Sequence, residues 1–147
     1  MTRELILVAD DSDANRMVAA GHLEAAGYDT VAVASGEEAL ELLATQRPAM
    51  VVLDVLMPGL GGLETCRRIR ATPELAELPV LFLTALGDRD VTGPALDAGA
   101  DDLLAKPFHR GELLLRVQAL LRHARVVREL RARIAELERQ LMGTVSI

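Results

Sequence analysis

Cysteine and long apolar runs are scarce in this chain of 147 residues, and each absence excludes a class of protein. The single cysteine, Cys66, cannot form an internal disulfide, which is typical of a reducing compartment, and its apolar and helical neighbours indicate a packed thiol. No apolar run approaches the ~18 residues of a membrane span, and no secretory segment opens the sequence. We therefore expect a cytoplasmic protein without membrane contact.

Aromatic residues make up only 2% of the chain, which disfavours nucleic acid as a direct partner. The net charge of −6 is unevenly distributed: residues 1–105 carry 7 basic and 18 acidic side chains, whereas residues 106–147 carry 9 basic and 4 acidic ones. The basic part nevertheless intersperses its arginines with glutamates and, beyond residue 110, has no Phe, Tyr or Trp that could stack on a base. We expect no direct contact with DNA or RNA.

What the chain does contain is a regular alternation of apolar runs and amphipathic segments. Strands are predicted at 4–9, 28–33, 50–53, 79–84 and 102–105. Helices are predicted between Ser12 and Gly27, between Ser35 and Pro48, at 63–71, within 88–99, and from Arg110 without a break until Gly143. This order predicts an α/β fold, with a parallel sheet covered by helices on both faces. We assign residues 1–122 to this domain and residues 123–147 to an extension of its last helix.

Five polar side chains stand where predicted strands end. Asp10 and Asp11 follow the first strand, Asp54 follows the third, Thr84 ends the fourth and Lys106 follows the fifth. Because parallel strands point the same way, these ends share one edge of the sheet, which is where open α/β sheets bind ligands. We therefore expect three carboxylates, a hydroxyl and an ammonium group to converge.

The three carboxylates predict a magnesium site. Closely spaced carboxylates repel one another unless a cation lies among them, and oxygen ligands without His or Cys select a hard ion such as Mg²⁺. A carboxylate can also attack phosphorus and form an aspartyl phosphate, whose oxygens the metal, Lys106 and Thr84 can contact. Asp54 stands alone on the middle strand, so we predict it as the nucleophile, with Asp10 and Asp11 as metal ligands.

Four stretches together resemble the receiver domain of bacterial two-component response regulators over residues ~4–122. They are ILVADDSDANR, VVLDVLMPGLGGLE, PVLFLTA and GADDLLAKPF, and they occur in the order and at the strand ends that the family requires. The resemblance implies a flavodoxin-like, five-stranded doubly wound sheet with strand order 2-1-3-4-5. It further implies a switch rather than an enzyme, one that takes a phosphoryl group from a sensor histidine kinase.

The same resemblance implies a role for each site residue. Asp54 is similar to the phosphoacceptor, Asp10 and Asp11 to the acidic pair, Thr84 to the switch hydroxyl and Lys106 to the phosphate-contacting lysine. In addition, the backbone carbonyl of Leu56 would complete the metal site, together with Asp10, Asp11 and Asp54. The bond between Lys106 and Pro107 is expected to be cis.

The chain departs from the family at positions that affect the lifetime and the transmission of the signal. Receivers commonly carry Tyr or Phe three residues before the lysine, where this chain has Leu103, so the usual aromatic relay is in doubt. The residues two beyond Asp54 and two beyond Thr84 are Leu56 and Leu86. Neither can orient a water molecule by hydrogen bonding, which predicts slow self-dephosphorylation.

Three alternatives use similar residues or the same fold. Aspartate-nucleophile phosphatases and dehalogenases place the nucleophile in a D-x-D motif after the first strand, where this chain has the adjacent pair Asp10 and Asp11. A flavodoxin-type FMN binder needs a Ser/Thr-rich loop at that place, and this loop is acidic. A receiver-like dimerisation scaffold that is never phosphorylated is the third alternative, and the presence of all five site residues argues against it.

The last part of the chain has its own pattern. Apolar residues recur at the 3-4-3-4 spacing of a coiled coil, namely Val127, Leu130, Ile134, Leu137 and Leu141. With Val127 at position a, Arg133 (g) and Glu138 (e) are of opposite sign, which favours a parallel homodimer. The alternative is a single helix that folds back on its own domain, because two heptads are short for a stable coil.

Helices of this kind join receivers to output domains. The ending ERQLMGTVS resembles the lead-in to the phosphoacceptor helix of histidine kinases, although Ile147 departs from that pattern. We therefore expect an output domain that is not in this chain, with a histidine kinase as one candidate.

Overall fold

A computed structural model describes residues 3–85 and 91–145 of the protein. Its centre is a five-stranded parallel sheet in the order β2-β1-β3-β4-β5. The strands are β1 (Leu5–Ala9), β2 (Asp29–Val33), β3 (Met50–Asp54), β4 (Val80–Ala85) and β5 (Asp102–Lys106). The order 2-1-3-4-5 predicted from the sequence is confirmed, and the strand bounds agree with the apolar runs to within a residue or so.

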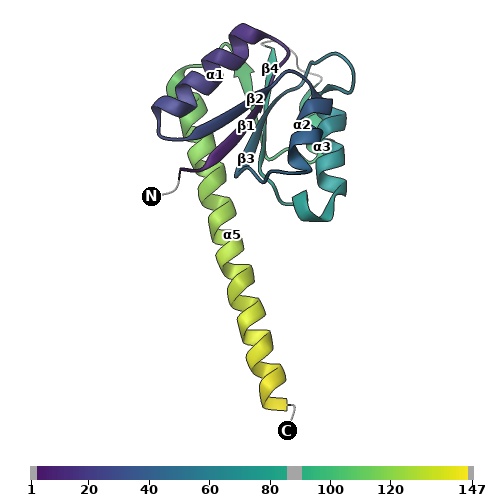
Figure 1. Ribbon diagram of the computed structural model, residues 1–147, viewed down its shortest axis with the longest axis vertical. Coiled ribbons are helices and arrows are strands. Elements are labelled where there is room, and N and C mark those ends of the chain that lie inside the picture. Colours follow the sequence, from purple (N-terminus) through teal and green to yellow (C-terminus); the bar gives the residue numbers. More distant parts are fainter. Residues whose placement is uncertain (1–2, 86–90, 146–147) are drawn as a thin grey trace.

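Helices cover both faces of the sheet, as expected for parallel strands joined by crossovers. They are α1 (Asp13–Ala25), α2 (Gly36–Leu43), α3 (Gly61–Ala71), α4 (Thr92–Ala98) and α5 (Arg110–Val145), with a short 3₁₀ helix η1 at Pro73–Leu75. Figure 1 shows α2 and α3 together on one side of the sheet, with α1 and α5 on the other. The first residues predicted for the fourth helix, 88–90, lie outside the described residues.

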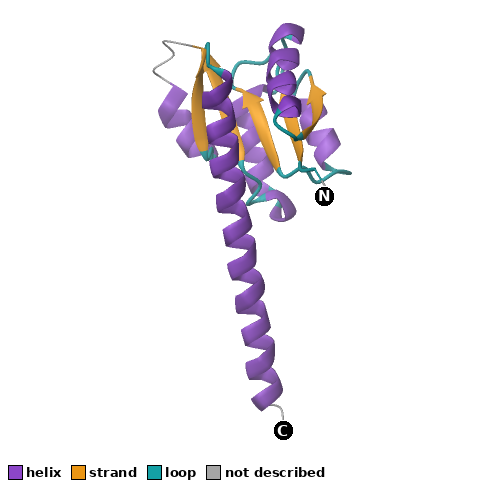
Figure 2. Cartoon of the chain, turned by 90° about the vertical axis from the view of Figure 1, so that its left-hand side faces the viewer, coloured by secondary structure: helices purple, strands orange, loops and turns teal. Residues whose placement is uncertain are grey.

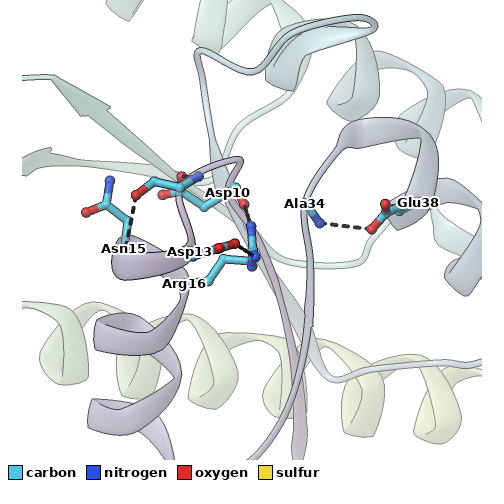
Figure 3. Close-up of polar contacts among 7 residues, drawn as sticks. Asp10, Asp13, Asn15, Arg16, Ala34 and Glu38 are labelled. Carbon is cyan, nitrogen blue, oxygen red and sulfur yellow. Dashed lines mark hydrogen bonds and ion pairs between the residues drawn. The ribbon is translucent and has the colours of Figure 1, made fainter.

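The helix ends follow the predicted capping residues. The Ser12 hydroxyl accepts a hydrogen bond from the Asn15 N–H, and the Ser35 hydroxyl accepts one from the Glu38 N–H, 3.1 Å away. Glu38 in turn accepts from the Ala34 N–H, which closes the capping box (Figure 3). Gly27, at φ 101°, follows α1 in the left-handed conformation that glycine adopts most easily.

Two apolar clusters pack on the two faces of the sheet. Ile6, Val8, Val52 and Leu81 face α1 and α5 and pack with a set of buried helix residues that comprises Ala19, Leu23, Leu113, Val117 and Leu121. On the other face, Leu7, Val51 and Phe82 pack against α2, α3 and α4, where the buried helix residues include Ala39, Leu43, Cys66, Ile69 and Ala95. Cys66 is the packed thiol that its neighbours indicated, and its Sγ lies 3.3 Å from the Ala98 carbonyl.

The longest helix, α5, starts on the sheet and then projects far beyond it (Figure 2). It does not fold back on the domain, so that alternative is wrong. It also continues through Gly143 to Val145, whereas a break at Gly143 was predicted. One glycine inside a helix costs only about 1 kcal/mol, and Gly143 does not take the positive φ that would end the helix. No helix in the described part of the chain is long and apolar enough to cross a membrane.

Candidate functional site

The carboxyl ends of four strands bring the predicted site residues to one edge of the sheet. Asp10 follows β1, Asp54 ends β3, Thr84 lies near the end of β4 and Lys106 ends β5. The register places Asp54 beside Leu83, one residue before Thr84, and pairs Thr84 with Ala105, one residue before Lys106. The convergence expected from parallel topology is therefore present.

Three carboxylates form a compact cluster at this edge. Asp10, Asp11 and Asp54 each offer a carboxylate oxygen, and these atoms lie within 4.8 Å of one another. Asp10 and Asp54 are buried, at 1% and 7% exposure, whereas Asp11 is exposed to solvent. An all-oxygen donor set with one open side fits a hard divalent cation such as Mg²⁺, which keeps part of its water shell.

Lys106 is the only lysine in the sequence, and it reaches into this cluster. Its Nζ lies 3.0 Å from Asp10 Oδ2 and 3.4 Å from Asp54 Oδ2. The ammonium group therefore bridges the two buried carboxylates and offsets part of their mutual repulsion. It also places a positive charge beside Asp54, the position where phosphoryl oxygens would need one.

The carboxyl group of Asp54 is electrostatically unusual. Burial, with the nearby Asp10 charge as a second cause, raises the pKa of Asp54 from 3.8 to about 6. The Lys106 ammonium and a hydrogen bond from the Leu56 N–H act in the opposite direction without cancelling the increase in pKa. A cation among the three carboxylates would favour the ionised form, so the donor set and the charge balance both fit a bound metal.

The hydroxyl of Thr84 is buried beside the cluster without a hydrogen-bond partner among the residues that the structure describes. Buried hydroxyl groups are normally paired, because an unpaired one loses its hydrogen bonds to water on folding. A hydroxyl held ready in this way can donate to an oxygen that arrives at the neighbouring Asp54. The sequence identified the residue, whereas its unsatisfied hydroxyl is visible only in three dimensions.

The loop between β3 and α3 lies tightly against the Asp54 backbone. A Cβ on Gly62 would lie 2.2 Å from the Asp54 carbonyl oxygen, so only glycine fits there. Gly59 has a φ of 80° and passes close to Glu37, whose carboxylate accepts a hydrogen bond from the Leu60 N–H at 3.3 Å. The glycines that follow Asp54 in the sequence therefore allow this close return of the chain.

Sequence reasoning missed Arg16, which holds the backbone at the start of α1. Its guanidinium donates to the Asp10 carbonyl at 2.7 Å and is paired with the Asp13 carboxylate (Figure 3). The Ser12 N–H donates to Asp10 Oδ1 at 2.9 Å, so three separate groups orient Asp10, counting Lys106. Spacing along the chain gave no signal for Arg16, because a long flexible side chain can take many directions.

The remaining predicted residues are Leu56, Leu86, Leu103 and Pro107. Leu56 lies two residues beyond Asp54, the last residue of β3, and is 64% exposed. Leu103 is half-buried and packs against the apolar core on the α2, α3 and α4 face of the sheet, and Leu86 lies outside the described residues. The Lys106–Pro107 peptide bond is cis.

An apolar cavity opens beside Lys106. It measures about 360 Å³ and lies between α1 and the chain that follows β5, with Asn15, Val18, Leu83, Ala85, Pro107 and Phe108 in its lining. Lys106 therefore borders an apolar surface as well as the carboxylate cluster.

The profile of the response regulator receiver domain matches residues 6–118, which include every site residue described above. The chain belongs to the response regulator receiver family. Receiver domains are in general phosphoacceptor switches that sensor histidine kinases phosphorylate, and they bind Mg²⁺ at an acidic pocket. The acidic cluster of this receiver is Asp10, Asp11 and Asp54.

Characterised relatives and solved structures agree with this assignment. The receiver is 50% identical over 117 residues to the response regulator MprA of Mycolicibacterium vanbaalenii, covering 80% of this chain and 50% of that protein. It is 47% identical over 121 residues to MprA of Mycobacterium ulcerans, covering 82% of this chain and 51% of that one. The chain thus spans about half the length of the curated relatives it matches.

Two solved structures show the same fold. The signal receiver domain of a signal transduction histidine kinase from Syntrophus aciditrophicus is 36% identical, with a TM-score of 0.77, and the match covers 82% of this chain and 91% of that one. The receiver domain of the Francisella response regulator 1452 is 33% identical, with a TM-score of 0.74, over 82% of this chain and 98% of that one. Receivers thus match this chain both from a regulator and from a kinase.

Proposed function

We propose that this receiver accepts a phosphoryl group on Asp54 from the phosphohistidine of a sensor histidine kinase. The observation that carries the proposal is the position of Asp54, which is buried at a strand end with its carboxylate 3.4 Å from the Lys106 ammonium and beside the Asp10–Asp11 pair. A carboxylate with those neighbours can act as a nucleophile toward phosphorus and have the incoming negative charge neutralised.

The chemical step is a direct transfer. An Asp54 carboxylate oxygen attacks the phosphorus, an acyl phosphate P–O bond forms, the P–N bond to the histidine breaks, and the imidazole leaves and takes up a proton. Lys106 moves from bridging two carboxylates to contacting a phosphoryl oxygen. Asp10, Asp11, Asp54 and the Leu56 carbonyl would hold Mg²⁺, which when bound neutralises the charge on the transferring group.

Thr84 is the residue that we expect to respond first to phosphorylation of Asp54. Its unpartnered hydroxyl can donate a hydrogen bond to a phosphoryl oxygen on Asp54, which would draw the end of β4 toward the site. Leu103 stands where many receivers have an aromatic ring, and an aliphatic side chain has neither ring nor hydroxyl to turn inward. We therefore assign the onward signal to the backbone after Thr84 and to α4.

A decisive experiment measures the intact mass of the chain with and without Mg²⁺ and a small phosphodonor such as acetyl phosphate. We expect the mass of one added phosphoryl group, dependent on Mg²⁺ and absent in Asp54→Asn. Asp97→Asn, which removes an exposed carboxylate on α4, is the matched control and should be labelled like the wild type. An Asp54→Asn variant labelled at the wild-type rate would refute the nucleophile assignment, and a wild type that is never labelled would favour the scaffold alternative.

The output of the switch is the second half of the proposal. We infer that phosphorylation changes how α5 is held and that the change passes along this helix, in a homodimer, to an output domain outside this chain. The separation of α5 into a part on the sheet and a projecting part supports this division of labour (Figures 1 and 2).

A further inference from the structure

The projecting part of α5 exposes an apolar stripe. Leu130, Ile134, Leu137 and Leu141 are between 42% and 66% exposed, and with the half-buried Val127 they form what we call the seam. Beyond Arg131, which is paired with Glu77, no other described element runs beside the helix in Figure 2. A contiguous apolar stripe of this kind on a soluble domain usually marks an interaction surface.

Beyond Val127, which lines a cavity between α5 and the base of the sheet, the seam faces away from the domain to which the helix belongs. Leu113, Val117 and Leu121 are the α5 residues buried against the sheet. Leu130 lies nine residues after Leu121, about two and a half turns further, and is therefore on the opposite side of the helix. The domain therefore cannot cover the seam from Leu130 onward while α5 keeps its place on the sheet.

Two ion pairs hold the helix in that orientation. Arg125 is paired with Glu4, at the entrance to β1, and Arg131 is paired with Glu77, in the chain before β4. Both arginines lie on the side of α5 that continues the buried stripe rather than on the seam. The helix is therefore fixed to its own domain by one face and presents the other.

We propose that the seam binds the seam of a second copy of this chain. The two helices are parallel, so both receivers lie at the same end of the pair, each on the side of its helix away from the seam. This inference deepens the proposed function by naming the partner of α5, and it rests on residues that take no part in phosphoryl transfer. Self-association suits the stripe, because apolar residues at a and d positions form a seam that is complementary to itself.

Charges beside the seam favour the parallel orientation. In a parallel pair, Arg133 at position g faces Glu138 at position e of the partner helix, and Arg131 can stay with Glu77. In an antiparallel pair, e positions face e positions, so Arg131 would meet the partner's Glu138 only by leaving Glu77. The parallel arrangement keeps the Arg131–Glu77 pair, and Arg133 needs only to turn from Glu136 of its own helix, 3.2 Å away, to the partner's Glu138.

Sedimentation of the full 147-residue chain tests the interface. We expect a dimer for the wild type and a monomer for Leu130→Glu with Leu137→Glu, which would place four carboxylates in the seam. Ala132→Glu with Ala135→Glu adds the same charge on the opposite side of α5 and should remain dimeric. A monomeric wild type, or a seam variant that stays dimeric, overturns the proposal.

Cross-linking tests the orientation. Cys66 is fully buried, so a new cysteine is the only reactive one. Under mild oxidation, Leu130→Cys should give a disulfide-linked dimer, because equal d positions face each other only in a parallel pair, and Ala132→Cys should not. A dimeric Leu130→Cys variant that does not cross-link overturns the parallel arrangement.

Acetyl phosphate labelling of the seam variant separates this proposal from the proposed function. We expect Leu130→Glu with Leu137→Glu to be labelled at Asp54 like the wild type, because α5 beyond residue 125 does not touch the site. Labelling without a dimer in the wild type would refute the interface alone, and a dimer without labelling would refute the phosphoacceptor alone.

Discussion

Asp54 illustrates how a functional side chain can cost stability in the folded protein. Its pKa is raised to about 6 from 3.8, so the folded state favours the protonated carboxyl group. Stability is therefore unaffected below about pH 4, falls as the pH rises from about 4 to 6, and stays lower above that. The full effect is up to about 3 kcal/mol, because one pKa unit corresponds to about 1.4 kcal/mol.

This electrostatic cost predicts that Asp54→Asn is more stable than the wild type without metal. Denaturant unfolding in EDTA at pH 7.5 should show a gain of about 1–3 kcal/mol, which shrinks toward pH 4 as the wild-type carboxyl group takes up its proton. Added Mg²⁺ should narrow the difference at neutral pH, because it stabilises only the carboxylate cluster. A gain that is the same at both pH values would contradict the charge explanation.

The apolar side chain at position 56 predicts a long lifetime for the acyl phosphate on Asp54. The exposed, apolar side chain of Leu56, two residues beyond Asp54, cannot position a water molecule for attack on phosphorus by hydrogen bonding. We expect Leu56→Asn to lose the phosphoryl group faster, measured as the decay of the phosphorylated mass after the donor is removed. Leu56→Met, which preserves the apolar character, is the matched control, and equal decay rates in both variants would argue against this role.

The secondary-structure elements explain why so much of the fold was predictable. Buried parallel strands are continuous apolar runs, and residues such as Ser12, Ser35 and Gly99 mark helix ends, so the strand order and most boundaries could be derived. The polar residues at strand ends followed from the same topology. The side-chain contacts of Arg16 and of Arg125 could not be derived, because long flexible side chains leave no periodic trace.

For the glycines too, the sequence pattern predicts the local structure in part, whereas their contacts with other elements are visible only in the fold. The sequence placed Gly61 and Gly62 in a loop, whereas α3 begins at Gly61. The close approach of Gly62 to the Asp54 carbonyl became visible only when β3 and α3 were placed together. In contrast, the residue type of Gly143 favours a helix end, but α5 continues through it.

The contact between α3 and β3 predicts that Gly62→Ala damages both stability and function. The added methyl group would lie 2.2 Å from the Asp54 carbonyl oxygen, so the two elements must separate. Such overpacking costs roughly 1–3 kcal/mol or more and should slow labelling of Asp54. Gly21→Ala, inside α1 with nothing within 4 Å of the new Cβ, should instead gain about 0.5–1 kcal/mol and be labelled normally. Equal stabilities for the two variants would refute the close contact.

The whole molecule is a compact sheet domain joined to the straight helix α5, whose projecting part, from residue 123 onward, we call the lever. Between the base of the sheet and α5 lies a cavity of about 900 Å³, with Leu5, Leu78, Leu120, Ala124 and Val127 among the residues in its lining. The pairs Arg125–Glu4 and Arg131–Glu77, which we call the brace, connect the helix to the sheet domain around this open space. Exposed ion pairs contribute only about 0–1 kcal/mol each, so the brace sets the direction of α5 rather than the stability of the fold.

Removal of the brace should therefore weaken the connection between the projecting part of α5 and the sheet domain without unfolding the domain. We expect Arg125→Gln with Arg131→Gln to remain dimeric and to accept a phosphoryl group, because neither arginine belongs to the seam or to the site. Spin labels on Ala132→Cys in each helix of the dimer should give a distance distribution that shifts on phosphorylation in the wild-type background. In the brace variant the distribution should be broader and the shift smaller, because the helix can turn about its contacts with the sheet.

The control for the brace keeps the number of charges lost and changes only their position. Arg122→Gln with Arg139→Gln also removes two arginines from α5, and it should preserve the wild-type shift. Because ion pairs at the surface are screened by salt, the wild type in about 1 M salt should approach the behaviour of the brace variant. A brace variant whose label distances respond to phosphorylation like the wild type would show that the buried contacts of Leu113, Val117 and Leu121 alone transmit the signal.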